Sequence, residues 1–258
     1  MKAVILAGGL GTRMREETEF RPKPMVEVGG RPVLWHIMKI LATQGISDFV
    51  VCTGYKGEMI KDYFANYATR NMDFTVRLGK EPEFTFHGTH DEENWRVTVA
   101  DTGPNTQTGG RLYGVRKYLG EERFLVTYGD GLANVKLSEL EKLHTQAKSL
   151  VTVTSAKPRG RFGVLELDDK GKVLSFSEKP EGKEWVNIGY MMMEPGFLKY
   201  LNSDSVLEEE PLRRVAQEGQ LSAHKHSGFW QPMDTLREAK ILSDLWETGA
   251  APWKIWAT

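Results

Sequence analysis

The sequence has 258 residues, of which 40% are hydrophobic and 27% are charged, and its formal net charge is −1 at pH 7. This composition is typical of a globular protein with a substantial core, in one large domain or two small ones. The balanced charge argues against nucleic-acid binding. Cys52 is the only cysteine, which excludes an intramolecular disulfide, and the apolar run DFVVCTG around it predicts a buried thiol.

The N-terminal run AVILA is too short for the apolar part of a signal peptide, and it leads directly into glycines. No stretch approaches the roughly 18 apolar residues of a membrane-spanning helix. We therefore expect a cytoplasmic protein that does not bind membranes.

The first half of the chain alternates strand and helix patterns. Short apolar runs predict strands at 2–7, 48–54, 73–79, 96–101, 123–131 and 150–156, and helical spacing predicts helices at 31–45, 58–68, 110–120 and 137–147. In the first of these helices, Leu34, Ile37 and Leu41 repeat at helical intervals, and Gly45 follows its end. Strands separated by helices predict a mostly parallel sheet that is covered on both faces.

After residue 156 the pattern changes. The runs FGVLEL and VLSFSEK, joined by DDKGK, predict an antiparallel hairpin over 162–179. Further strands are predicted at 186–194 and 220–226, and a last helix at 235–247. There is no internal repeat and no linker rich in Pro, Gly or Ser. We predict one Rossmann-like α/β domain over 1–258, with antiparallel additions to the sheet in its C-terminal half.

A glycine-rich segment, GGLGTR at residues 8–13, follows the first strand directly. It lacks the Gly-Lys-Ser/Thr of a P-loop. It is also a near miss for the dinucleotide-binding fingerprint, because Met14 stands where the third glycine belongs and the acidic residue expected about 20 residues later is missing. Glycines let free backbone N–H groups approach an anion, although a tight turn alone would also explain them.

Neighbouring residues favour the anion site. Thr12 and Arg13 add a hydroxyl and a planar fork of donors to the loop. Lys23 lies between two prolines, which restrict the backbone around it and suit the lysine to hold a phosphate. Together these residues predict a triphosphate site.

Two carboxylates are candidates for a metal site. Asp130 follows a buried strand in LVTYGDGLAN, at the edge where parallel sheets bind ligands, although an aspartate between glycines is also good turn chemistry. Asp234 precedes a helix, where Thr235 and Glu238 already have capping-box spacing, which leaves Asp234 available for another role. Two carboxylates together with substrate phosphates are what Mg²⁺ usually binds.

Several motifs, in order along the chain, resemble those of the sugar-1-phosphate nucleotidylyltransferases: LAGGLGTRM, RPKPMVEVGGRP, DTGPNTQTGGRL, TYGDGLA, RFGVL, FSEKP and GFWQPMDTLRE. The narrower motifs TGGRL, TYGDG and GFWQPMDTLR resemble the branch that joins CTP and glucose 1-phosphate into CDP-glucose, with Mg²⁺. The resemblance implies a nucleotidyltransferase domain in which 1–135 mainly bind nucleotide, while 136–258 mainly bind sugar phosphate and form oligomer contacts. It also implies a homo-oligomer, with a hexamer as one candidate.

The resemblance further implies roles for individual residues. The nucleotide side would comprise Leu6, Ala7, Gly8, Gly9, Leu10, Gly11, Thr12, Arg13, Lys23, Thr106, Gly110, Arg111 and Gly129, with Arg13 and Lys23 catalytic. The sugar phosphate would contact Glu178, Lys179, Asn187 and Gly189, and Mg²⁺ would bind Asp130 and Asp234. The attacking phosphate oxygen is already ionised near neutral pH, so the reaction needs charge neutralisation and alignment rather than a strong base.

Ile188 departs from the family pattern, which usually has Asn-Gly-Gly where this chain has Asn-Ile-Gly. A β-branched residue here affects the predicted sugar side, so another hexose 1-phosphate, or another base, stays an alternative. A catalytically silent nucleotide-sugar binding protein is a second alternative, disfavoured because the charged residues are all present. An NAD-dependent oxidoreductase is disfavoured by Met14.

Other clusters have blander interpretations. The segment HGTHDEE at 87–93 is predicted to be a polar loop rather than a metal site, and the histidines of HKH at 224–226 share one face of a strand in a surface or supporting role. The methionines at 191–193 are expected in the core. The three tryptophans of 245–256 are expected to pack onto the body or onto a neighbouring subunit.

Overall fold

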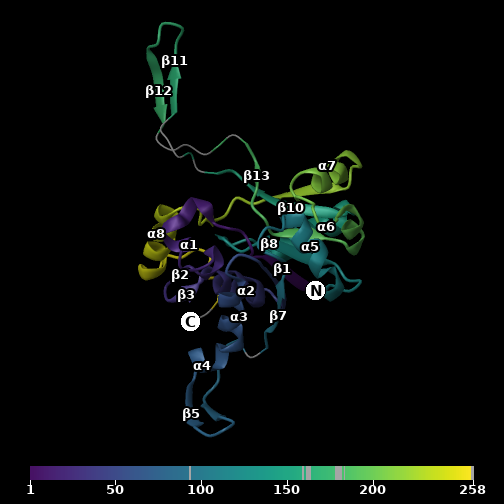
Figure 1. The fold of residues 1–258 in the computed structure, drawn as a ribbon. Coiled ribbons are helices and arrows are strands. Elements are labelled where there is room, and N and C mark those ends of the chain that lie inside the picture. The colour runs from purple at the N-terminus through teal and green to yellow at the C-terminus, as the bar shows by residue number, and fades with distance from the viewer. Residues whose placement is uncertain (93, 159, 161–163, 178–181, 183, 257–258) are drawn as a thin grey trace.

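The computed structural model describes the chain except for residues 93, 159, 161–163, 178–181, 183 and 257–258. Its centre is a sheet that has eight strands among the described residues, in the neighbour order β13-β10-β14-β8-β1-β4-β7, with β15 attached to β10 (Figure 1). These strands are β1 (Lys2–Leu6), β4 (Asp48–Thr53), β7 (Arg96–Asp101), β8 (Phe124–Tyr128), β10 (Val151–Ala156), β13 (Val186–Asn187), β14 (Met191–Met193) and β15 (Leu221–Lys225).

The pairing of these strands is mostly parallel. β1, β4, β7 and β8 pair in parallel, as do β10 and β15, whereas β13 and β14 are antiparallel to their neighbours. The predicted Rossmann-like sheet with antiparallel additions from the C-terminal half is therefore confirmed.

Helices cover both faces of the sheet because its central strands are buried on both sides. In β1, Ala3 and Ile5 join the core cluster that includes α2 (Val33–Thr43), whereas Val4 and Leu6 join the cluster that includes α5 (Thr108–Val115). The first cluster also takes residues from α3 (Gly57–Ala65), α6 (Leu137–Ala147) and α8 (Leu236–Glu247), and the second from α7 (Glu210–Gln217). Cys52 and the methionines of β14 are fully buried, as predicted.

The remaining elements are short. They are the helices α1 (Arg15–Thr18) and α4 (Tyr67–Asn71), and the 3-10 helices Thr12–Met14, Lys23–Met25, Arg116–Tyr118 and Pro195–Tyr200. The two-stranded pairs are β2 (Glu27–Val28) with β3 (Arg31–Pro32), β5 (Asp73–Arg77) with β6 (Glu83–His87), β9 (Gly131–Ala133) with β16 (Trp230–Pro232), and β11 (Val164–Leu167) with β12 (Val173–Ser177). Among the described residues, no helix combines the length and the apolar composition that crossing a membrane requires.

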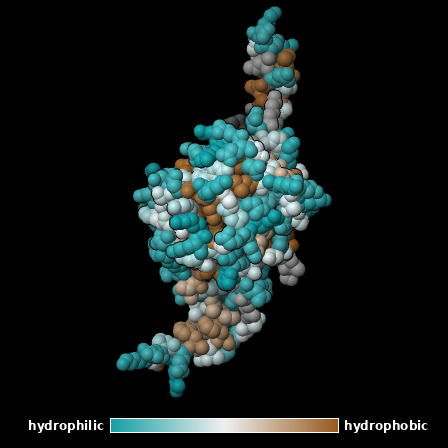
Figure 2. Space-filling model, turned by 90° about the vertical axis from the view of Figure 1, so that its right-hand side faces the viewer, coloured by the Kyte–Doolittle hydropathy of each residue, from teal (hydrophilic) through white to brown (hydrophobic). Residues whose placement is uncertain are grey.

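The β11–β12 and β5–β6 hairpins project from opposite ends of the body (Figures 1 and 2). The predicted hairpin at 162–179 is confirmed over its described part. The predicted strand at 73–79 forms β5, but it pairs with β6 rather than with the central sheet.

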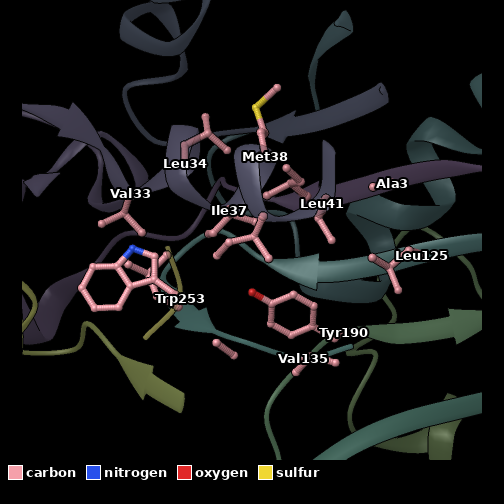
Figure 3. Close-up of a cluster of buried hydrophobic side chains, with 14 of the residues drawn as sticks. Ala3, Val33, Leu34, Ile37, Met38, Leu41, Leu125, Val135, Tyr190 and Trp253 are labelled. Atoms are coloured by element: carbon pink, nitrogen blue, oxygen red, sulfur yellow. The ribbon is translucent and has the colours of Figure 1, made fainter. Parts of the chain in front are cut away.

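The segment after α8 returns to α2. Trp253 is completely buried, and Figure 3 shows it beside α2 side chains such as Val33. The rings of Trp246, Trp253 and Trp256 lie 4.8, 6.2 and 6.2 Å from the imidazole of His36, centroid to centroid. We predicted that these tryptophans pack either onto the body or onto a neighbouring subunit, and the structure shows that they pack onto the body of their own chain.

Candidate active site

The glycine loop turns sharply at the end of β1. Gly11 has a φ of +62°, and a Cβ there would lie 2.6 Å from Cγ2 of Thr18, so both backbone conformation and space favour glycine. The residues that follow form a short 3-10 helix (Thr12–Met14), which Gly11 precedes. Met14 is completely buried, so the residue that breaks the dinucleotide fingerprint serves as core.

Four charged side chains meet beside this loop. Nζ of Lys23 lies 2.6 Å from Oδ2 of Asp130 and 2.6 Å from Oδ1 of Asp234, and Nη1 of Arg13 lies 2.6 Å from Oδ2 of Asp234. The Arg13 side chain is 69% exposed, whereas that of Lys23 is 9% exposed, so Lys23 lies deeper in the protein. The residues predicted to hold the triphosphate and those predicted to hold the metal therefore form one cluster, which we call the charge cluster.

Main-chain pairing brings the two aspartates together although they are 104 positions apart in the sequence. Asp130 directly precedes β9, and Asp234 follows β16 by two residues. Gly131 pairs with Pro232 in the β9–β16 ladder, and the N–H of Met233 donates to the carbonyl of Asp130 over 2.8 Å. This ladder holds both carboxylates at one place.

The helix start after Asp234 has the predicted capping residues. The N–H of Glu238 donates to Oγ1 of Thr235 over 3.3 Å, and Oε2 of Glu238 accepts from the Thr235 hydroxyl at 3.1 Å. The same oxygen accepts from the main-chain N–H of Asp234 at 2.8 Å, which ties the Asp234 backbone to α8. The Asp234 carboxylate takes no part in this capping and faces the charge cluster instead.

A cavity of about 310 Å³ opens between the glycine loop and the charge cluster. Its lining comprises Leu6, Ala7, Gly8, Gly9, Gly11, Thr12, Arg13, Lys23, Pro24, Thr106, Gln107, Thr108, Arg111, Tyr128, Gly129, Asp130 and Asp234. Most residues predicted for the nucleotide side are in this lining, but Leu10 and Gly110 are not. Leu10 is 49% exposed, and a Cβ on Gly110 would lie 2.2 Å from the carbonyl oxygen of Ser203, so Gly110 allows close packing.

Arg111 is only 4% exposed and lines this cavity. Nη1 donates to the carbonyls of Thr53 at 3.0 Å and Gly103 at 2.7 Å, and Nη2 donates to the carbonyl of Gly8 at 2.8 Å. Burial lowers the pKa of Arg111 from its usual value. Because these donors are used on main-chain oxygens, Arg111 fixes the start of the glycine loop against the ends of β4 and β7.

A second cavity, also of about 310 Å³, adjoins the first. Its lining comprises Arg13, Thr127, Tyr128, Asp130, Gly131, Asn187, Ile188, Trp230, Pro232 and Asp234. Arg13, Tyr128, Asp130 and Asp234 line both cavities, so the charge cluster lies at their junction.

The predicted sugar-side residues have different outcomes. Asn187 and Ile188 line the second cavity, and Ile188 is 5% exposed because its side chain also joins the core. Gly189 has a φ of +82°, and its N–H donates to Oδ1 of Asn187 over 3.0 Å, which orients that side chain. Glu178 and Lys179 lie outside the described residues.

Tyr128 and Glu208 are site residues that sequence reasoning missed. The Tyr128 hydroxyl donates to Oε1 of Glu208 over 2.6 Å, and the Thr108 hydroxyl donates to Oε2 over 2.6 Å. Nδ2 of Asn187 lies 3.5 Å from the Tyr128 hydroxyl. The motif TYGDG contained a signal for Tyr128, whereas Glu208 lies in an acidic run that resembles any solvated surface.

The donor set of the charge cluster fits a small divalent cation. Oxygens of Asp130 and Asp234 converge on one point, where they already share a positive charge. Two carboxylates with substrate phosphates suit Mg²⁺. In the described part of the chain, no group of three or more His, Cys, Asp or Glu side chains could hold a metal. In the segment HGTHDEE, Nζ of Lys39 lies 3.0 Å from Oε1 of Glu92.

The comparisons with known proteins agree with this geometry. The family model described as nucleotidyl transferase matches residues 2–231. The chain is 48% identical to a glucose-1-phosphate cytidylyltransferase of Salmonella typhi and 40% identical to a probable glucose-1-phosphate cytidylyltransferase of Bacillus subtilis, in each case over 99% of this chain and 100% of the relative.

Solved structures share the fold at lower identity. HddC from Yersinia pseudotuberculosis superposes with a TM-score of 0.68 at 22% identity, covering 95% of this chain and 99% of that one. A UDP-glucose pyrophosphorylase complexed with UDP-glucose gives a TM-score of 0.69 at 16% identity, covering 96% and 98%. The family-model match and the full-length relatives show that this chain belongs to the nucleotidyl transferase family.

Proposed function

We propose that this protein transfers the cytidylyl group of CTP to glucose 1-phosphate, giving CDP-glucose and pyrophosphate. The observation that carries the proposal is the charge cluster at the junction of two adjoining cavities. Full-length relatives named as glucose-1-phosphate cytidylyltransferases support the choice of substrates. A catalytically silent binding protein would have no need for two cations and two carboxylates at this junction.

In this proposal the first cavity takes CTP and the second takes the sugar phosphate. Main-chain groups around Leu6 and Ala7, held in place through Arg111, would select the base by hydrogen bonding. Asn187, Ile188 and Tyr128 would contact the sugar, and Glu178 and Lys179 keep their predicted roles toward it.

The reaction is an in-line displacement. An ionised oxygen of the sugar phosphate attacks the α-phosphorus of CTP and forms a new P–O bond. The bond from that phosphorus to the oxygen bridging to the β-phosphate breaks, and pyrophosphate leaves with the electron pair. Arg13 and Lys23 neutralise the charge that develops on the phosphates and keep the two anions together. A Mg²⁺ ion held by Asp130 and Asp234 would supply further positive charge to the phosphate oxygens.

The test is pyrophosphate release with Mg²⁺ over a grid of CTP, UTP, dTTP and ATP against the 1-phosphates of glucose, galactose and mannose. A signal at CTP with glucose 1-phosphate is expected, and it should fall by orders of magnitude in Asp130→Asn and Asp234→Asn. A signal with CTP and another hexose would reassign the sugar. No signal anywhere would favour the binding protein.

We also propose that copies of this chain form a homo-oligomer. We propose the cytoplasm as its location, because CTP is available there. The β11–β12 hairpin exposes Leu174 (60%) and Phe176 (61%), and β5–β6 exposes Phe84 (49%). A lone two-stranded hairpin is marginally stable in water, so apolar hairpins of this kind gain stability when another subunit covers them. Sedimentation of the wild type and of Leu174→Ser/Phe176→Ser tests this: assembly should weaken in the variant, and a monomeric wild type would contradict it.

A further inference from the structure

The charge cluster places an ammonium group where the proposed function needs a metal ion. Lys23 Nζ contacts Asp130 Oδ2 and Asp234 Oδ1 at the same distance, 2.6 Å. Its side chain is 9% exposed and that of Asp234 is 14% exposed, so water screens the contact between these two little, whereas the Asp130 side chain is 36% exposed. The lysine therefore neutralises the carboxylates from the point on which they converge.

This position conflicts with a divalent cation at the same carboxylates. Mg²⁺ approaches carboxylate oxygens to about 2.1 Å, so an ion shared by both aspartates would lie next to the Lys23 ammonium. Arg13, at 2.6 Å from Asp234 Oδ2, adds a second positive charge on the other oxygen of that carboxylate. The two cations already balance the charge of the two carboxylates. A metal ion that enters without nucleotide is therefore repelled by the cations and finds both carboxylates already paired.

We infer that Lys23 acts as the counter-ion of Asp130 and Asp234 in the ligand-free protein, and that nucleotide phosphates draw it away and open the metal site. The inference rests on the proposed function, which places a divalent cation at these two aspartates. It adds that nucleotide and metal strengthen each other's binding by the same factor, since coupling between two binding equilibria is reciprocal.

The local structure allows the lysine to move while the carboxylates stay. Lys23 follows Pro22 and opens a short 3-10 helix (Lys23–Met25), so its backbone is fixed and the flexible side chain carries the motion. The Asp130 backbone is held by the β9–β16 ladder, and that of Asp234 by Glu238. Lys23 also lines the first cavity, so bound phosphates would lie within its reach.

The experiment measures Mn²⁺ affinity of the full chain without nucleotide, from the electron paramagnetic resonance signal of free Mn²⁺. Lys23→Met should bind Mn²⁺ about tenfold or more tightly than the wild type, because it exposes both carboxylates. The gain should disappear in Lys23→Met/Asp234→Asn. The matched control is Lys240→Met, which removes one positive charge from an exposed pair with Asp244 on α8 and should leave the affinity unchanged.

An affinity of Lys23→Met for Mn²⁺ equal to or weaker than that of the wild type would overturn the inference. If this variant is too unstable to titrate, its melting temperature replaces the titration: Mn²⁺ should raise it more than it raises that of the wild type, and an equal or smaller rise would equally overturn the inference. Failure of the proposed metal site gives a different result. Asp234→Asn would then bind as much Mn²⁺ as the wild type in the presence of CTP, after the Mn²⁺ bound by CTP without protein has been subtracted.

Discussion

Tyr128 donates its phenolic hydrogen to Glu208 over 2.6 Å, and this bond fixes the ring in the wall shared by the two cavities. Burial and the Glu208 carboxylate raise the pKa of Tyr128, so the hydroxyl keeps its proton throughout the physiological range. Glu208 also accepts from Thr108, which lines the first cavity. The Glu208 carboxylate thus orients Tyr128, which lines both cavities, and Thr108, which lines the first.

Replacing Glu208 by alanine should therefore affect both substrates. We expect Glu208→Ala to raise the KM of CTP and of the sugar phosphate by about three- to tenfold each, because Tyr128 and Thr108 would pass on to each substrate only part of the about 1.5–3 kcal/mol that hydrogen bonds to a charged group contribute. Steady-state kinetics with each substrate varied in turn measures this. The adjacent exposed Glu209→Ala is the control and should behave as wild type. A change in only one KM would show that the contacts of Glu208 matter for one substrate alone.

Two neighbouring glycines of the loop should respond differently to alanine. A Cβ on Gly8 would lie 2.1 Å from Nη1 of Arg111, whereas a Cβ on Gly9 has nothing within 4 Å. Gly8→Ala must displace the buried guanidinium, so it should cost about 1–3 kcal/mol of stability and raise the KM of CTP at least about tenfold. Gly9→Ala should leave the stability unchanged, because its Cβ meets no protein atom. Chemical unfolding of both variants and CTP kinetics of Gly8→Ala test this, and equal losses of stability in the two variants would refute the role given to Arg111.

Ile188 should influence the sugar and the core but not the nucleotide. Its side chain is 5% exposed, packs in the core and lines only the second cavity. Ile188→Gly should cost about 2–5 kcal/mol of stability and change the KM or the preference for hexose 1-phosphates, while the CTP parameters stay nearly constant. Ile188→Val, a smaller truncation, should give a smaller effect of the same kind. Parallel changes in both substrates would show that Ile188 acts on the whole site.

His36 should make stability depend on pH. Burial lowers its pKa from 6.5 to about 4, and the nearby Arg31 charge acts in the same direction. Between these values the unfolded chain binds a proton that the folded chain does not, so the free energy of unfolding rises with pH over this window. The wild type should lose about 2 kcal/mol through His36 between about pH 7 and about pH 5.

The measurement is chemical unfolding at both pH values. In His36→Gln this part of the pH dependence should disappear, whereas the exposed His87→Gln should retain it. An unchanged pH dependence in His36→Gln would mean that other groups cause it.

Local sequence patterns predicted those structural features that depend only on residues close together in the sequence. The apolar run of β1, the spacing of Leu34, Ile37 and Leu41 in α2 and the capping residues Thr235 and Glu238 each describe a structure that forms within a few residues. Partner choice is different, because the sequence 73–79 reads as a strand whether it joins the central sheet or pairs with β6, as it does.

The site could be predicted only where residue type and spacing carry the chemistry. Arg13, Lys23, Asp130 and Asp234 stood out as charges at the ends of strands and loops, although nothing in the sequence indicated that Lys23 would pair with both aspartates. That contact depends on the β9–β16 ladder, which joins segments about a hundred residues apart. Glu208 was missed for the same reason, since its role depends on the distant Tyr128.

The packing of Trp253 on His36 has a consequence for synthesis of the protein. Nε1 of Trp253 donates to Nδ1 of His36 over 3.4 Å, between residues 217 positions apart. At about 5–20 residues per second, a ribosome that has made α2 needs roughly 10–40 s before it adds the ring that covers this face. During that time the growing chain presents an unfinished apolar surface to chaperones and to neighbouring nascent chains. The speed of translation therefore bears on how much of this protein reaches its folded state.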